Sequence, residues 1–80
     1  MEQQHIKHCL DQVERFAGML ESKSTERSHD AIVAQLAFNW GRYVELAHTD
    51  GRADWKFLET CLENQHYTLI AKLANERRQI

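Results

Sequence analysis

The sequence predicts an all-α fold, a three-helix up-down-up bundle formed by a single domain of 80 residues. Residues that favour helices are prominent, whereas proline is absent and glycine occurs only three times. Apolar residues recur at steps of three and four along three long stretches, which is the spacing of helices with a buried side. The two segments between these stretches are short and polar, so consecutive helices should pack as antiparallel neighbours.

The first helix is expected from about residue 2 to residue 21. Its apolar positions form one stripe, which is typical of a helix with one buried face. They are Ile6, Cys9, Leu10, Val13, Phe16, Ala17 and Leu20. The loop that follows is rich in Ser and Thr, whose hydroxyls favour helix caps. Ser24, Thr25 or Ser28 can cap the next helix, and the sequence does not choose among them.

The second helix is expected over residues 26–48 and should be the central element, because it is apolar on two sides. One side carries Ile32, Leu36, Trp40, Tyr43 and Ala47. The opposite side carries Ala31, Ala34, Phe38 and Gly41. A helix that is apolar on both sides must be covered on both sides. We expect the helix to pass through Gly41 unbroken, with the glycine admitting a close neighbour; the alternative is a kink there.

The third helix is predicted over residues 52–78, after a turn at Thr49–Gly51. Gly51 suits a left-handed residue that ends the preceding helix, and Asp50 or Gly51 should cap the next one. Arg77 and Arg78 fall in the last turn, where cations complement the helix dipole. A core stripe at helical spacing comprises Trp55, Leu58, Leu62, His66, Leu69 and Leu73.

A second stripe on this third helix carries no charge, which is unusual for a solvent-facing surface in such a charged chain. It comprises Ala53, Phe57, Thr60, Asn64, Tyr67 and Ala71. Aromatic and small residues without charge resemble the core of an interface. Together with Ala34, Phe38 and Gly41, the stripe predicts a surface for a partner, and we expect a helical homodimer. The alternative is that Phe57 and Tyr67 are two unrelated exposed aromatic residues.

Few residues suggest a chemical site. His5 and Cys9 lie one helical turn apart, and His48 falls near the same end of the bundle, so these three are weak candidates for metal ligands. A buried thiol and solvated histidines are the favoured interpretation, and we expect no metal or cofactor. Cys9 and Cys61 fall at similar heights, but two cysteines in a cytoplasmic chain favour free thiols over a disulfide. His66 is interpreted as a packed core histidine, with a pH-sensitive role as the alternative.

The composition excludes several classes of function. The net charge of −2 disfavours a general attraction to nucleic acid or to anionic membranes. No apolar run is long enough to span a bilayer, and the polar N-terminus lacks the apolar core of a signal peptide, so a cytoplasmic location is expected. The acidic residues are scattered, so no catalytic residues are predicted.

The sequence therefore predicts a non-enzymatic protein–protein interaction module. Such a protein would act as a regulator, adaptor or inhibitor that binds a larger protein target through a helical face. The alternative is a nucleic-acid-binding regulator of the helix-turn-helix type. Its basic residues would have to gather on one exposed face, and only the Arg77–Arg78 pair is concentrated in this chain.

Overall fold

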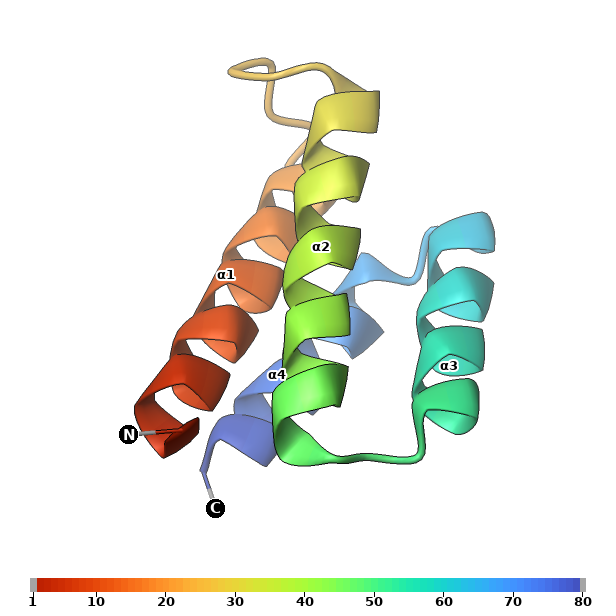
Figure 1. Ribbon diagram of the computed structural model, residues 1–80. Coiled ribbons are helices and arrows are strands. Elements are labelled where there is room, and N and C mark those ends of the chain that lie inside the picture. The colour runs from red at the N-terminus through yellow and green to blue at the C-terminus, as the bar shows by residue number, and fades with distance from the viewer. Residues whose placement is uncertain (1, 80) are drawn as a thin grey trace.

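The computed structural model describes residues 2–79, which form four α-helices and no strand. The helices are α1 (Glu2–Glu21), α2 (His29–Ala47), α3 (Gly51–Glu63) and α4 (Tyr67–Arg78). Successive helices run in opposite directions, with α1 and α2 paired, α3 on the far side of α2, and α4 behind (Figure 1). The all-α class is confirmed, but the prediction of three helices is wrong, because the expected third helix is two helices.

The break lies at Asn64–His66 and results from a left-handed residue that is not glycine. Gln65 has φ 58°. The N–H of His66 donates to the carbonyl of Cys61 at 2.8 Å, and the N–H of Gln65 donates to the carbonyl of Leu62 at 3.3 Å. This pair of hydrogen bonds is the Schellman arrangement that closes a helix. Neither glycine nor proline stands at the break, so no residue type in the sequence indicates it.

The break changes which residues are buried along this part of the chain. Leu58 is buried as predicted, but His66 is exposed and becomes the first flanking residue of α4. The predicted core residues Trp55 and Leu69 are 39% and 46% exposed. The core interpretation of these three residues is therefore wrong. The buried side of α3 runs through Asp54, Leu58 and Cys61, so Trp55 lies at its margin. After the turn α4 begins anew and presents a different side, which leaves Leu69 exposed. The buried positions of α3 and α4 are Asp54, Leu58, Cys61, Ile70 and Ala74.

The other helix ends are set by specific caps. Ser28 caps α2 by accepting a hydrogen bond from the N–H of Ala31, and Asp50 caps α3 by accepting one from Ala53. The prediction of a left-handed Gly51 is wrong, because that conformation falls on His48 with φ 54° and Gly51 is the first residue of α3. Lys23, with φ 56°, plays the same role after α1.

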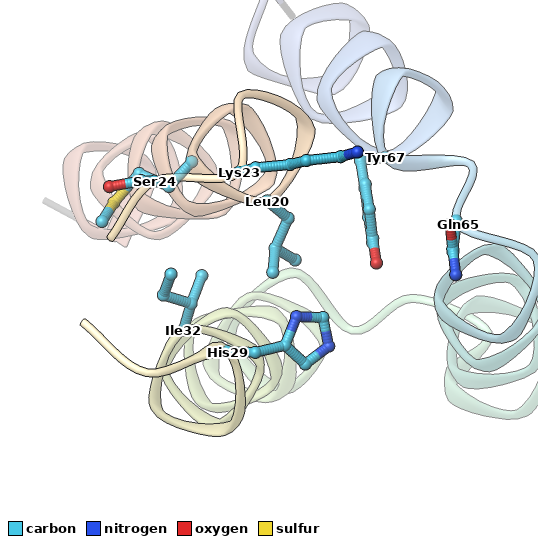
Figure 2. A pocket seen from close by; sticks show the side chains of 8 residues that line it. Leu20, Lys23, Ser24, His29, Ile32, Gln65 and Tyr67 are labelled. Carbon is cyan, nitrogen blue, oxygen red and sulfur yellow. The ribbon is translucent and has the colours of Figure 1, made fainter. Parts of the chain in front are cut away.

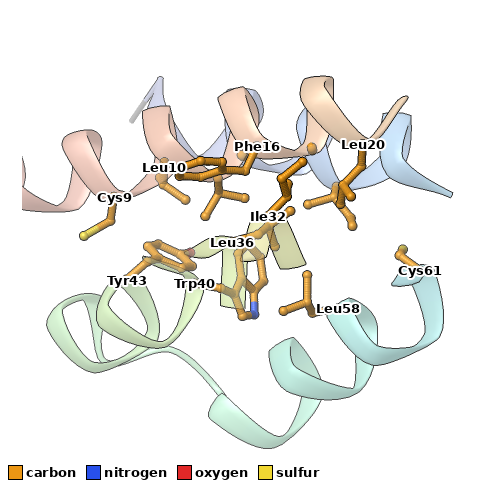
Figure 3. Close-up of a cluster of buried hydrophobic side chains, with 14 residues drawn as sticks. Cys9, Leu10, Phe16, Leu20, Ile32, Leu36, Trp40, Tyr43, Leu58 and Cys61 are labelled. Carbon is orange, nitrogen blue, oxygen red and sulfur yellow. The ribbon is translucent and has the colours of Figure 1, made fainter. Parts of the chain in front are cut away.

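Trp40 lies at the centre of the core and is fully buried (Figure 3). It belongs to the predicted front side of α2, of which Ile32, Leu36, Trp40 and Tyr43 are all buried. Helix α1 packs extensively against both α2 and α4, whereas α3 packs more sparsely against α2 and α4. The α2 helix continues through Gly41, as expected. Within residues 2–79 no helix combines the length and the apolar character that crossing a membrane requires.

Candidate functional site

The most exposed large apolar side chain of the described residues is Phe38, on the outer side of α2, at 65% exposure. Trp55 of α3 lies beside it, on the same side of the molecule. A Cβ atom placed on Gly41 would lie 3.1 Å from Cζ2 of Trp55, so the indole rests directly on this glycine. The close neighbour that Gly41 was expected to admit is therefore Trp55. We call the surface formed by Ala34, Ala37, Phe38, Gly41 and Trp55 the aromatic face.

The aromatic face is hollowed on both sides of Phe38. On one side, an open depression of about 550 Å³ is bounded by the other four residues of the face and by Val44, Arg42 and Glu45. On the other side, a smaller depression of about 210 Å³ lies between Phe38 and the start of α1, where His5, His8 and Cys9 line it. Phe38 therefore forms a ridge between two hollows.

The uncharged stripe predicted along the third helix does not exist as one surface, because α3 ends at Glu63. Ala53 and Thr60 are exposed on α3, and Asn64 lies in the turn. Tyr67 and Ala71 are half-buried on α4. Phe57 is also half-buried, and its ring stacks against that of Trp40 with centroids 6.3 Å apart. These six residues are thus divided between two helices, whereas Ala34, Phe38 and Gly41 do share one face.

A buried polar cluster, which the sequence analysis missed, joins α2, α3 and α4. Asp54 is only 6% exposed, and its Oδ2 accepts a hydrogen bond from Nη1 of Arg77 at 2.7 Å. The same nitrogen donates to the hydroxyl of Tyr43 at 2.9 Å. The indole N–H of Trp40 donates to the backbone carbonyl of Asp54 at 3.1 Å. No spacing rule relates Asp54 to Arg77, so the sequence alone offered no means of pairing them.

The protonation of this cluster favours the ion pair. Burial by itself raises the pKa of Asp54, but the hydrogen bond from Arg77, a contribution from Thr49 and the positive charge of Arg77 together lower it below 3.8. The Thr49 hydroxyl is buried nearby and makes no hydrogen bond of ordinary geometry, so Arg77 is the partner that matters. The cluster stabilises the packing of the three helices, because its hydrogen bonds join residues of the chain to one another.

The basic pair at the end of α4 is engaged within the molecule. Arg77 is held by Asp54, while Arg78 forms ion pairs with Asp11 and with Glu14, the latter at 2.6 Å. A phosphate-binding surface needs cations that are not already neutralised. Both residues on which the nucleic-acid alternative depended have carboxylate partners within the chain, so neither is a free cation for a phosphate.

The weak metal candidates are not gathered into one site. His5 and Cys9 share the small depression beside Phe38, whereas His48 lines a different depression. Among residues 2–79, no three His, Cys, Asp or Glu side chains stand together in a way that would hold a metal ion. Cys9 and Cys61 are both buried free thiols, and burial raises the pKa of each. The expectation of free thiols is confirmed.

Comparisons with protein-family models, with curated proteins and with solved structures give no match. The function of the chain must therefore be inferred from its own surface. The feature that its internal packing leaves unexplained is the aromatic face, because an aromatic ridge in solvent contributes little to the core that Trp40 organises.

Proposed function

We propose that this chain is a non-enzymatic protein–protein interaction module that self-associates through the aromatic face. The observation that carries the proposal is the exposure of Phe38, 65% of which faces solvent beside Trp55. Exposed aromatic residues among small ones are typical of interface anchors, which fill a pocket on the partner. A cytoplasmic setting suits the two free thiols.

The occupant that fits this face best is a second copy of the same chain. A two-fold interface brings a surface against itself, so it must carry both a projection and a recess that receives it. Phe38 is the projection, and the depression of about 550 Å³ next to it, bordered by Gly41 and Trp55, is the recess. The rim carries both signs of charge, with Arg42 and Glu45, so a second copy meets no uniform repulsion.

Dimerisation supports the wider role of a regulator, adaptor or inhibitor. A dimer presents every remaining surface twice, and two linked contacts bind a larger protein target more tightly than one contact does. A domain of 80 residues also has only a small core, so covering an exposed aromatic ridge adds stability that the monomer lacks.

The test is the solution mass, measured by light scattering, of the wild type and of Phe38→Glu. We expect a dimeric wild type and a folded, monomeric variant, because a buried glutamate without a partner is strongly unfavourable at an interface. Leu69→Glu is the matched control: Leu69 is also a large exposed apolar residue, at 46%, but it lies on α4 outside the aromatic face. This control should remain dimeric.

Two results would contradict the proposal. A monomeric wild type would show that no second copy binds, and the aromatic face would then be the surface to present to a foreign protein target. A Phe38→Glu variant that stays dimeric would move the self-interface elsewhere. Loss of the dimer in Leu69→Glu alone would place it on α4.

A further inference from the structure

A cup at the opposite end of the helices from the polar cluster is lined by several polar side chains that have no hydrogen-bond partner within residues 2–79. Its volume is about 430 Å³, and it lies between the end of α1, the start of α2 and the turn that joins α3 to α4 (Figure 2). Its apolar lining comes from the half-buried Met19 and from the core residues Leu20 and Ile32, which are 5% and 1% exposed. This is a size that accommodates a small organic molecule.

The donor side chains of the cup come from two stretches of the chain, residues 23–29 and 65–67, that are far apart in sequence. Lys23 belongs to the loop after α1, His29 begins α2, Gln65 lies in the turn and Tyr67 begins α4. In Figure 2 the side chains of Leu20, His29 and Tyr67 border one open space, Lys23 extends toward Tyr67, and Gln65 lies on the other side of the Tyr67 ring. The fold, and no local motif, brings these four groups together.

All four groups can donate hydrogen bonds, and within residues 2–79 none of their side chains is engaged. Lys23 takes part in none of the three ion pairs, unlike Arg77 and Arg78 at the other end of the molecule. No hydrogen bond joins the side chains of His29, Gln65 or Tyr67 to another residue in that range. No acidic residue lines the cup. Its polar rim is therefore rich in donors and carries positive charge.

The surrounding helices add to this preference for negative charge. Helix α4 begins at Tyr67 with no side-chain cap and no acidic residue in its first turn. Its first N–H groups and the positive end of its dipole therefore lie beside the cup without a neutralising carboxylate. This arrangement adds to the preference for a negatively charged ligand that the four donors of the cavity indicate.

We propose that the cup is a binding site for a small organic anion, a carboxylate or a phosphate attached to a short apolar group. The anion is held by the ammonium of Lys23 and the donors of His29, Gln65 and Tyr67. The apolar group lies on Leu20 and Ile32. This site is separate from the aromatic face and does not depend on self-association.

The test uses the full ¹⁵N-labelled chain, titrated with hexanoate, inorganic phosphate and neutral hexanol while backbone amide shifts are followed. Saturable shifts at Lys23, His29, Gln65 and Tyr67 with at least one anion are the expected result. Which anion saturates distinguishes carboxylate from phosphate. Binding of hexanol as strong as that of hexanoate would overturn the anion assignment, as would the absence of saturation with either anion.

Two variants test the residues themselves. Lys23→Gln keeps a polar side chain, one atom shorter, and removes its charge, and it should weaken anion binding by about tenfold or more. Tyr67→Phe keeps the ring and removes one donor, and it should weaken binding less. Lys72→Gln, at an exposed lysine of α4 outside the cup, is the matched control and should bind as the wild type does. Unchanged binding in Lys23→Gln would overturn the proposal.

Discussion

Nη1 of Arg77, in the last turn of α4, lies 2.7 Å from Oδ2 of Asp54, in the first turn of α3. The same nitrogen lies 2.9 Å from the hydroxyl of Tyr43 on α2. One guanidinium thus joins three helices. Helix α3 packs sparsely against its neighbours. The contacts of Arg77 and the Trp40 hydrogen bond to the Asp54 carbonyl therefore hold the first turn of α3 in place.

Removing Arg77 should destabilise the fold much more than removing its neighbour. Arg77→Met leaves the Asp54 carboxylate buried without a partner, and we expect the free energy of unfolding to fall by about 2–3 kcal/mol. Arg78→Met breaks ion pairs whose carboxylates are 54% and 38% exposed, so solvent screens them and the loss of stability should be clearly smaller. Urea unfolding measures both. Equal losses would show that the Asp54 pair has no special role.

The same ion pair should make stability depend on pH in the acid range. The pKa of Asp54 lies below 3.8 in the folded state, so the folded state binds this proton less readily than the unfolded state does. Its contribution to stability is present above the ordinary pKa of an aspartic acid and is lost as the pH falls through the lower pKa of the folded state. The free energy of unfolding of the wild type should therefore fall more steeply over this range than that of Asp54→Asn. Parallel curves would contradict this assignment.

The sequence predicted the features that depend on the spacing of apolar residues, but it missed those that depend on the conformation of a single residue. The extent of α1 and the buried front side of α2 followed from apolar spacing. The opposite side of α2 was expected to be covered, and the chain by itself leaves Phe38 of that side exposed. The end of α3 did not, because Gln65 adopts a left-handed conformation that Gln rarely takes. The polar cluster and the cup were also missed, since each joins residues that only the tertiary structure brings together.

The three left-handed residues offer a direct test of helix termination. Lys23, His48 and Gln65 all have positive φ, and none is glycine. A non-glycine residue in this region is strained by about 1–2 kcal/mol. Glycine removes this strain, but its greater conformational freedom in the unfolded state offsets part of the gain. Replacing each with glycine should therefore raise the free energy of unfolding by about 0.5–1 kcal/mol. Thermal and urea unfolding of the three single variants measure the gain.

A glycine at a helical residue without a positive φ should have the opposite effect. Glu63→Gly is the control, because Glu63 is the last residue of α3 and does not have a positive φ. It should lower the free energy of unfolding by about 0.5–1 kcal/mol. A loss of stability in Gln65→Gly as large as that in Glu63→Gly would show that the left-handed turn between α3 and α4 is not the native ending of α3.

Gly18 and Gly41 both lie inside helices, but replacement by alanine should stabilise the fold fully at only one of them. A Cβ on Gly18 meets nothing within 4 Å, so Gly18→Ala should gain about 1 kcal/mol from helix propensity. A Cβ on Gly41 lies 3.1 Å from Cζ2 of Trp55, so the indole must move and Gly41→Ala should gain less or lose stability. Urea unfolding compares the two. Equal gains would mean that Trp55 does not rest on Gly41, and the aromatic face would lose the packing that holds its tryptophan beside Phe38.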